Sequence, residues 1–254
     1  MTQHVFITAG GSGLGLAMAK AFLDNGAKVA VTDADPAMLE RARADAPGLV
    51  GFTADASNED EMADVFSQLR SRWTDLDVVM ANAGTAGPTA AIEDVTLTEW
   101  KSCLAVNLDG SFLTARLAAP WMKDQQRGVM TLTSSTAGLF GYPFRSPYAA
   151  AKWGIIGLMK TLAMELGPFG IRVNAICPGA VEGDRMDRVI AKEAEARGIS
   201  EADLRQGYGD CVSLRRFVTA EDIANTALFL ASPMAKNVSG MAMTVDGHTE
   251  KVTL

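Results

Sequence analysis

The sequence predicts a single-domain α/β fold, in which a doubly wound parallel sheet of seven strands carries helices on both faces. Its 254 residues fit one domain. Short apolar runs alternate with longer segments of helical spacing, a pattern typical of parallel strands joined by helical crossovers. The first apolar run leads directly into a glycine-rich turn and a helix. Ligands of such sheets bind at the carboxyl ends of the strands, so the binding site is expected there.

The expected strands are the short apolar runs of the chain. The first helix is expected over residues 14–25, where apolar residues recur in helical rhythm up to Gly26, a suitable C-cap. The expected strands cover residues 5–8, 28–32, 49–53, 78–81, 128–134, 172–176 and 241–245.

Residues 182–213 interrupt this alternation, because they are polar, rich in Glu, Arg and Asp, and helical in pattern without a strand. They follow Cys177-Pro178-Gly179, which has the form of a turn at the end of a strand. Such a segment would project over the ligand crevice, where mobile lids are common. We therefore expect a substrate lid within the single domain 1–254; a solvated pair of surface helices is the alternative.

Composition and charge exclude several classes of function. Lys+Arg 23 against Asp+Glu 30 gives a net charge of -7, which disfavours binding to nucleic acid or an anionic membrane. The two histidines, His4 and His248, and the three cysteines form no CxxC or HExxH pattern, so no metal site is expected. A Ser-His-Asp hydrolase would need one of these two terminal histidines as its base.

The start of the chain gives an expectation about its location. The chain opens on an apolar strand-like segment rather than a basic region followed by a long apolar stretch and a cleavage site. No apolar run approaches the roughly 18 to 20 residues of a membrane-spanning helix, and the sparse, odd number of cysteines fits reduced thiols. We expect a cytoplasmic protein.

Four glycines lie within six residues at the end of the first expected strand, at Gly10, Gly11, Gly13 and Gly15. Glycine allows a tight turn and a close approach of the backbone to a pyrophosphate at the positive helix N-terminus. The plain GxGxxG spacing is not met, because Leu16 stands at the third position. A purely structural turn is the alternative interpretation of this loop alone.

Asp33 ends the second expected strand, 20 residues after Gly13, which is the usual separation to the carboxylate that binds the adenosine ribose. A carboxylate here repels a 2′-phosphate, and residues 34–39 contain no Arg or Lys to hold one. The sequence therefore favours NAD over NADP. The alternative is that Asp33 only begins a turn with Asp35 and Pro36.

Tyr148 and Lys152 lie four residues apart in the expected helix 146–165, so they share one face. An ammonium beside a phenol favours the phenolate and brings the pKa of this acid or base closer to working pH. Upstream, Ser134 and Ser135 lie at the carboxyl end of the expected strand 128–134 and offer a hydroxyl to a substrate oxygen. Each of these features also occurs by chance, or as a simple helix cap.

Taken together, the motifs resemble the short-chain dehydrogenase/reductase family in its single-domain form, over nearly the whole chain. The family's TGxxxGxG loop matches Thr8 to Gly15, its NAG motif Asn82 to Gly84, and its YxxxK motif Tyr148 to Lys152. The resemblance implies the catalytic set Asn107, Ser135, Tyr148 and Lys152. It implies cofactor binding by Gly10, Ser12, Gly13, Leu14, Gly15, Asp33, Asp55, Ala56, Asn82, Ala83, Gly84, Tyr148, Lys152, Pro178, Gly179 and Val181.

The resemblance also implies a reaction, namely hydride transfer between NAD and the carbinol carbon of a secondary alcohol. Tyr148 would exchange the hydroxyl proton and Ser135 would orient the reacting oxygen. Lys152 would lower the pKa of Tyr148 and bind the nicotinamide ribose, while Asn107 would hold a helix kink and a water. A small polar alcohol or ketone of the sugar, polyol or hydroxy-acid class is the expected substrate.

Three positions depart from the family pattern. Ala9 replaces the first glycine of the loop, which we expect to be tolerated because Gly10 and Gly11 keep the turn flexible. Gly183 stands where many relatives carry a threonine that holds the nicotinamide carboxamide. His248 replaces a second glycine near the C-terminus.

Substrate contacts are less determined by the sequence. Arg145 lies three residues before Tyr148 and could bind an anion bidentately; a place in solvent or at a subunit interface is the alternative. Arg188 is a weaker candidate on the expected lid. The residues expected to line the pocket are Ser135, Leu139, Phe140, Tyr142, Arg145 and Arg185.

Two other functions stay open at this stage. One is a 3-oxoacyl thioester or general carbonyl reductase, which Asp33 and the acidic surface disfavour. The other is a non-enzymatic NAD-sensing relative, which commonly loses the catalytic residues that are all present here. Family members usually form tetramers, and we expect a homotetramer through the helices that contain Asn107 and Tyr148 together with the C-terminal strand.

Overall fold

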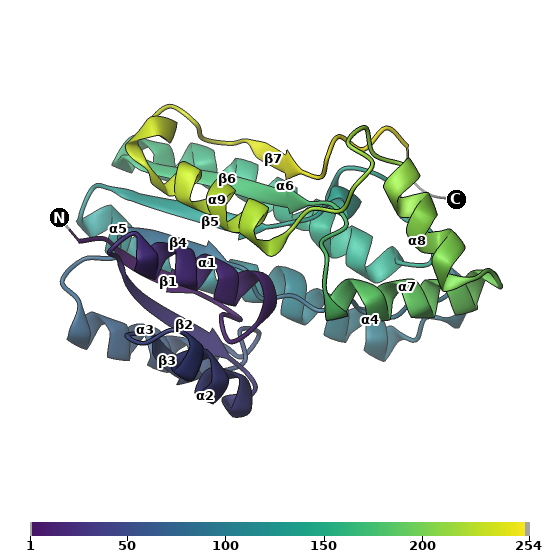
Figure 1. The fold of residues 1–254 in the computed structure, drawn as a ribbon. Helices are drawn as coiled ribbons and strands as arrows, with labels where there is room; N and C mark the ends of the chain where they lie inside the picture. The colour runs from purple at the N-terminus through teal and green to yellow at the C-terminus, as the bar shows by residue number, and fades with distance from the viewer. Residues whose placement is uncertain (1, 252–254) are drawn as a thin grey trace.

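The computed structural model describes residues 2–251 as a three-layer α/β/α domain (Figure 1). One parallel seven-stranded sheet has the order β3-β2-β1-β4-β5-β6-β7, which confirms the expected doubly wound fold. The observed strands match the expected ranges to within two residues at each end. They are β1 (His4–Ile7), β2 (Lys28–Asp33), β3 (Val50–Thr53), β4 (Val78–Ala81), β5 (Gly128–Thr133), β6 (Ile171–Pro178) and β7 (Ala242–Val245).

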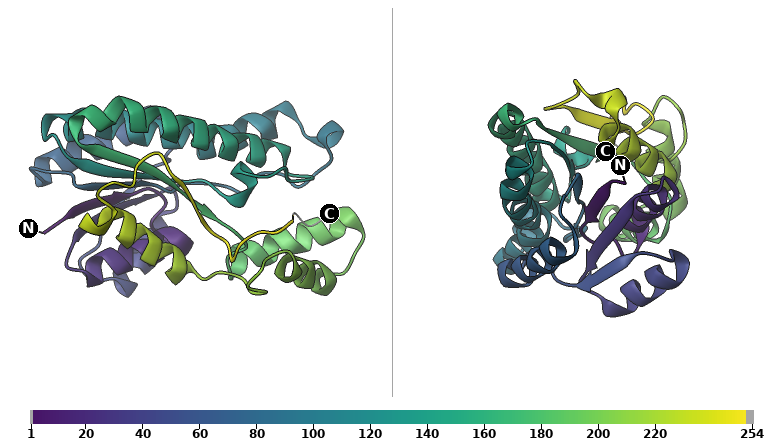
Figure 2. Two further views of the ribbon diagram at one scale, coloured as in Figure 1. Left: turned by 90° about the horizontal axis from the view of Figure 1, so that it is seen from above. Right: turned by 90° about the vertical axis from the view of Figure 1, so that its left-hand side faces the viewer.

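Helices cover both faces of the sheet, as the view from above shows (Figure 2). The side chains that pack together on one face come from α1 (Gly13–Asp24), α2 (Pro36–Asp45) and α9 (Ala220–Ala231). The other face is covered by α3 (Glu59–Arg72), α5 (Gly110–Asp124) and α6 (Ser146–Leu166). Before α5 lies α4 (Leu97–Leu104), joined to it by the π-helical turn Ala105–Asp109.

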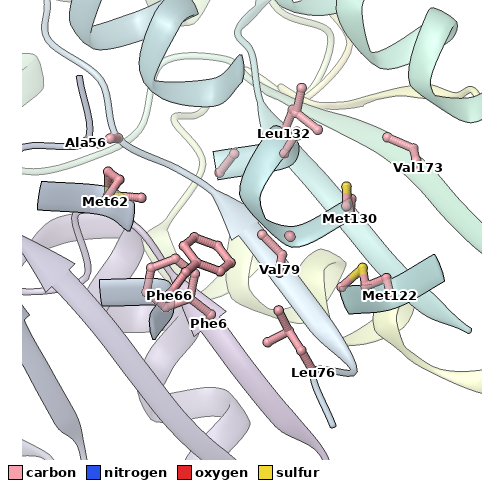
Figure 3. Packing of buried hydrophobic residues seen from close by; sticks show 14 of the residues in the cluster. Phe6, Ala56, Met62, Phe66, Leu76, Val79, Met122, Met130, Leu132 and Val173 are labelled. Atoms are coloured by element: carbon pink, nitrogen blue, oxygen red, sulfur yellow. The ribbon is translucent and has the colours of Figure 1, made fainter. Parts of the chain in front are cut away.

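The strands are buried because helices cover both of their sides. All four residues of β4 are buried, and so are the four central residues of β2. In the cluster under α3 and α5, Phe6 meets Phe66 edge to face with ring centroids 5.1 Å apart, and both lie beside Val79 (Figure 3). This core fixes the positions of the strand ends that carry the site.

The first helix differs slightly from its expected limits. It spans Gly13–Asp24, and Asn25 rather than Gly26 is its C-cap. Gly26 follows with a φ of 79°. This left-handed conformation costs glycine little free energy, because glycine has no Cβ atom. The helix therefore ends one residue earlier than the sequence pattern indicated, and Gly26 lies one position beyond the C-cap.

Residues 182–213 contain two helices, α7 (Asp184–Arg197) and α8 (Glu201–Asp210). They project beyond the sheet at the end opposite the N-terminus, near the C-terminal end of the described chain (Figures 1 and 2). We refer to α7 and α8 as the lid. No helix within residues 2–251 is both long and apolar enough to cross a membrane.

Candidate active site

The glycine-rich loop and the segment after β4 are tied together where the sheet changes winding direction, between β1 and β4. The Thr8 hydroxyl accepts hydrogen bonds from the backbone N–H groups of Asn82 at 2.9 Å and Ala83 at 3.0 Å. The Asn82 amide in turn donates to the carbonyls of Thr8 at 3.1 Å and Ala9 at 3.3 Å. These side chains hold the two loops that border the crevice in which open α/β sheets bind ligands.

Ala9 has a φ of 51°, whereas Gly10 and Gly11 do not have a positive φ, so these two glycines do not take up the bend. The left-handed bend of the turn lies on the alanine itself, at a cost of about 1 to 2 kcal/mol. The hydrogen bond from the Asn82 side-chain amide to the Ala9 carbonyl is one contact that stabilises this conformation.

Gly15 is required by close packing. A Cβ atom at this position would overlap the Ala9 carbonyl oxygen and lie 2.8 Å from Asn82 Nδ2. We expect Gly15→Ala to lower the free energy of unfolding by about 1 to 3 kcal/mol and to weaken dinucleotide binding, as measured by thermal unfolding with and without NAD. Gly167→Ala is the matched control, since Gly167 has no neighbour within 4 Å of such a Cβ atom. Equal stability of the two variants would contradict the role given to Gly15.

The residues expected to bind a dinucleotide follow the carboxyl ends of successive strands. Asp33 ends β2, and its carboxylate accepts the backbone N–H groups of Gly11 and Asp35, both at 3.1 Å. Ser12 precedes α1 without a side-chain capping bond, which leaves the N-terminal amides of this helix to bind phosphate oxygens. Gly10, Gly13, Leu14 and Gly15 lie at the β1–α1 turn, Asp55 and Ala56 after β3, Asn82 to Gly84 after β4, and Pro178, Gly179 and Val181 at or after the end of β6.

Two of these residues already have partners within the chain. The Asp55 carboxylate accepts hydrogen bonds from the backbone N–H of Ser57 at 2.9 Å and from its hydroxyl at 2.8 Å. Val181 forms a bridge with Val218. Gly183 stands where many relatives carry a threonine. It precedes α7 with a φ of 124°, and no side-chain hydrogen bond caps this end of the helix.

Tyr148 and Lys152 share one face in the first turns of α6, as expected. The Lys152 ammonium lies 5.5 Å from the centre of the Tyr148 ring and donates to the Thr133 carbonyl at 2.9 Å. Lys152 is buried. Ser135, directly after β5, hydrogen-bonds to Tyr148. Ser134 instead donates to the Lys152 carbonyl at 2.9 Å, so the two neighbouring serines have different surroundings.

Asn107 lies in the π-helical turn and is fully buried. Its Nδ2 donates to the carbonyls of Cys103 at 2.9 Å and Thr85 at 3.1 Å. A Cβ atom at Gly84 would lie 2.8 Å from Asn107 Oδ1 and 3.3 Å from Lys152 Nζ, so both atoms lie against this glycine. The expected helix irregularity and Lys152 therefore meet at the segment after β4.

Cations dominate the electrostatics around Tyr148. Burial by itself raises the pKa of this phenol, but the charges of Lys152, Arg185 and Arg145, together with the Ser135 hydrogen bond, outweigh burial and lower it below the ordinary value of 10.0. Burial also lowers the pKa of Lys152, an effect that the Tyr148 phenolate opposes. A phenol of lowered pKa is suited to act as a general acid and base.

Arg145 is buried, with 4% of its surface exposed, so the interpretation of this residue as a solvated side chain is wrong. Its guanidinium carbon lies 4.8 Å from the centre of the Tyr148 ring, and its Nη2 donates to the Ala86 carbonyl at 2.9 Å. Among residues 2–251, its buried Nε atom finds no hydrogen-bond acceptor. Arg185, on α7, is exposed and donates to the Gly84 carbonyl at 3.2 Å.

The remaining expected pocket residues lie in different surroundings. Leu139 is half-buried and packs against the main core, while Phe140 is 38% exposed. Tyr142 donates its hydroxyl hydrogen to Tyr208 on α8 at 2.6 Å. The weaker candidate Arg188 is exposed on α7. Thr8 was named only as the first residue of the TGxxxGxG match, without a role of its own. Tyr208 was not predicted as a site residue, because no local pattern of the sequence singles it out.

Comparison with known proteins agrees with this geometry. A family model described as Enoyl-(Acyl carrier protein) reductase matches residues 8–248. The chain is 34% identical to a D-beta-hydroxybutyrate dehydrogenase of Rhizobium meliloti, over 97% of this chain and 98% of that protein. It is also 34% identical to 2-(S)-hydroxypropyl-CoM dehydrogenase 3 of Xanthobacter autotrophicus, over 96% of this chain and 95% of that protein.

A solved structure shows the same architecture. The crystal structure of an NAD+-bound xylitol dehydrogenase superposes with a TM-score of 0.93 at 25% identity, and the match covers 96% of this chain and 98% of that one. The residues around the glycine-rich loop fit a nicotinamide dinucleotide, and the residues expected to be catalytic, among them Asn107 and Lys152, lie beside the segment after β4. The chain is an enzyme of the alcohol dehydrogenase and carbonyl reductase class, and it belongs to the short-chain dehydrogenase/reductase family.

Proposed function

We propose that the protein interconverts a small secondary alcohol that carries an anionic group, such as a hydroxy acid, with the corresponding ketone, using NAD. The observation that supports this substrate class is the cluster of three cations, Lys152, Arg145 and Arg185, that lower the pKa of Tyr148. Lys152 is the expected partner of the cofactor ribose, which leaves two arginines for the substrate. The similarity to a D-beta-hydroxybutyrate dehydrogenase supports the same class.

The chain's own residues perform the proton transfer. Ser135 and Tyr148 are hydrogen-bonded to each other, so both hydroxyls face the same reacting oxygen. In oxidation the Tyr148 phenolate accepts the alcohol proton, and in reduction the phenol returns it to the ketone oxygen. Lys152 holds the phenolate form by its charge. Asn107 Oδ1 lies against Gly84, as Lys152 Nζ does, and it has no hydrogen-bond partner among the described residues, so it can hold a water that passes protons outward. NAD, when bound, would supply the hydride chemistry at the carbinol carbon.

The substrate panel is the direct test. Absorbance of reduced nicotinamide is followed with NAD or NADP and with 3-hydroxybutyrate, other hydroxy acids, polyols, sugars, aryl alcohols and a 3-oxoacyl thioester. Faster turnover of anionic alcohols with NAD is the expected result. Preference for a neutral polyol or for the thioester would replace the proposed substrate class. If NAD binds and no alcohol in the panel reacts, the sensing alternative gains support.

The preference for NAD rests on Asp33. We expect Asp33→Asn to lower kcat/KM with NAD by about 10-fold or more, because a charged hydrogen-bond acceptor for the ribose hydroxyls is lost, an interaction of about 1.5 to 3 kcal/mol. The same change should raise use of NADP, since repulsion of the 2′-phosphate falls. Asp35→Asn is the matched control: Asp35 is a carboxylate two residues away whose side chain caps α2. Equal cofactor selectivity in both variants would argue against Asp33.

We further propose a cytoplasmic homotetramer. Three apolar side chains on α5 and α6 are exposed in the monomer: Phe112 at 46%, Trp153 at 51% and Met164 at 81%. Exposed apolar residues on neighbouring helices are consistent with a subunit interface. Sedimentation at micromolar concentration tests this assembly, and a pure monomer would reject it. The cytoplasmic location agrees with the three cysteines, which form no disulfide.

A further inference from the structure

The lid has a hydrophobic core of its own. Its buried members lie on α7 and α8, and one residue of the loop between β5 and α6, Tyr142, packs against them. Tyr142 therefore lies where the lid meets the loop that leads to Tyr148. The buried members are Ile190, Ala194, Leu204 and Tyr208, and the half-buried ones are Tyr142, Ala180, Met186 and Phe217.

A chain of hydrogen bonds crosses this contact. Tyr142 donates to the Tyr208 hydroxyl at 2.6 Å, and Tyr208 donates to Glu193 Oε2 at 2.6 Å. Glu193 is fully buried and pairs with Arg197 one turn later on α7, at 2.6 Å. The first of these bonds joins residues 66 positions apart in the sequence, so it connects the lid to the body of the enzyme.

The chain of donors has a fixed direction. Burial raises the pKa of Tyr142 and of Tyr208, so both phenols stay protonated at ordinary pH. Each hydroxyl hydrogen points toward the buried Glu193 carboxylate, and bonds in such a series strengthen one another in a low-dielectric interior. Separation of α8 from Tyr142 would break the Tyr142–Tyr208 hydrogen bond, and a buried polar group that loses its partner is unfavourable.

The same contact bears on the catalytic centre. Tyr142 begins the turn before α6, where its carbonyl accepts the backbone N–H of Arg145 at 3.4 Å. Within this turn Phe144 has a φ of 60°, a strained conformation for a residue with a side chain. The Arg197 guanidinium carbon lies 5.9 Å from the Phe144 ring centre. The lid thus touches the turn at Tyr142 and at Phe144, directly before Arg145.

We propose that the Tyr142–Tyr208 hydrogen bond is a latch that holds the lid closed and thereby positions Arg145 and Arg185 beside Tyr148. Tyr142 and Tyr208 are positioning residues in this scheme, because they act through the turn before α6 and through α7. This inference rests on the active site of the proposed function, but it does not depend on which alcohol is the substrate.

The first experiment measures hydrogen exchange by mass spectrometry in the NAD-bound enzyme, over residues 184–210. Tyr142→Phe and Tyr208→Phe keep the rings and remove the latch, so amide exchange in the lid should rise by about 2- to 10-fold, as expected for one net hydrogen bond. Tyr142→Phe is the milder variant, because Tyr208 can still donate to Glu193. The double variant should match the Tyr208→Phe single variant, since both remove the Tyr142–Tyr208 bond and the Tyr208–Glu193 bond.

Gln206→Ala is the matched control for this experiment. Gln206 donates to Asp210 at 2.9 Å on the exposed side of α8, so its loss removes a lid hydrogen bond that does not reach the body of the enzyme. Exchange over residues 184–210 should match wild type. If Gln206→Ala accelerates exchange as much as Tyr142→Phe, or if neither tyrosine variant accelerates it, the latch is rejected.

The second experiment tests positioning by titrating the tyrosinate absorbance. Of the three tyrosines, two have a raised pKa and Tyr148 a lowered one, so the alkaline band reports Tyr148, and Tyr148→Phe should remove it. The charged groups that face Tyr148 are Lys152 on α6, Arg185 on α7 and Arg145 before α6.

Opening the latch should move the two arginines away, so the midpoint of the Tyr148 titration should rise in both latch variants and stay unchanged in Gln206→Ala. Faster exchange with an unmoved midpoint would reject the positioning of Arg145 and Arg185. Neither readout uses a substrate, so a failure to turn over hydroxy acids would count against the proposed function alone.

Discussion

Tyr148→Phe is expected to lower kcat by about 10²- to 10⁴-fold, the usual contribution of a positioned general acid or base. The phenylalanine ring keeps the packing under Arg145 and beside Lys152 but has no proton to exchange with the substrate oxygen. The measurement is turnover under saturating NAD with the best alcohol of the panel. Gln206→Ala is the comparison, because Gln206 bonds to Asp210 on the exposed side of α8, away from Tyr148.

Binding of NAD must be measured in the same variants, by calorimetry or by quenching of intrinsic fluorescence. Retained affinity together with lost turnover would assign the loss to the chemical step. If Tyr148→Phe keeps wild-type turnover while NAD binds, the proposed proton transfer is wrong. If turnover and NAD affinity fall together, the residue acts in binding instead.

The lowered pKa of Tyr148 also predicts the direction of the pH dependence. Oxidation needs the phenolate, so its rate should rise with pH up to the pKa of Tyr148 and then level off, at a lower pH than an ordinary tyrosine with a pKa of 10.0 would allow. Reduction needs the phenol and should show the opposite slope. Loss of the positive charge at Arg185 or Arg145 raises this pKa, so both profiles should move to higher pH.

The sheet and the placement of Tyr148 and Lys152 on one helix face were predictable because they depend on local patterns. Each strand of a buried parallel sheet is a short apolar run, and the observed β4 has the same limits as the expected range 78–81. Tyr148 and Lys152 were predictable as a pair because four residues make one helical turn. The predicted order of the family motifs then assigned Ser135 and Asn107, which come from other segments of the chain.

The features that the sequence did not predict depend on the fold as a whole. The left-handed φ of Ala9 is supported from a loop more than 70 residues away, and no local pattern encodes that support. Burial of Arg145 depends on Tyr148 and on the segment after β4. The Tyr142–Tyr208 bond joins two segments whose relative position follows from the way α7 and α8 fold back.

Arg145→Ala is expected to lower kcat/KM for anionic alcohols by about 30-fold or more, equivalent to at least about 2 kcal/mol for a buried charge that loses its partner. The buried guanidinium has a free Nε hydrogen among the described residues, and a substrate anion would accept it. Neutral alcohols of similar size should lose much less, because they do not use this charge. The measurement is the ratio of kcat/KM values for a hydroxy acid and a matched diol.

The comparison with Arg145→Lys separates charge from structure. Lysine keeps the positive charge but loses the planar fork, so the preference for anionic alcohols should be intermediate between the wild type and the alanine variant. The bond to the Ala86 carbonyl gives Arg145 a structural role as well, which would affect all substrates equally. If Arg145→Ala lowers kcat/KM for the hydroxy acid and for the diol by the same factor, Arg145 has a structural role only. The proposal of an anionic substrate is then rejected. If the ratio collapses while turnover of the diol persists, the guanidinium is the group that selects the substrate.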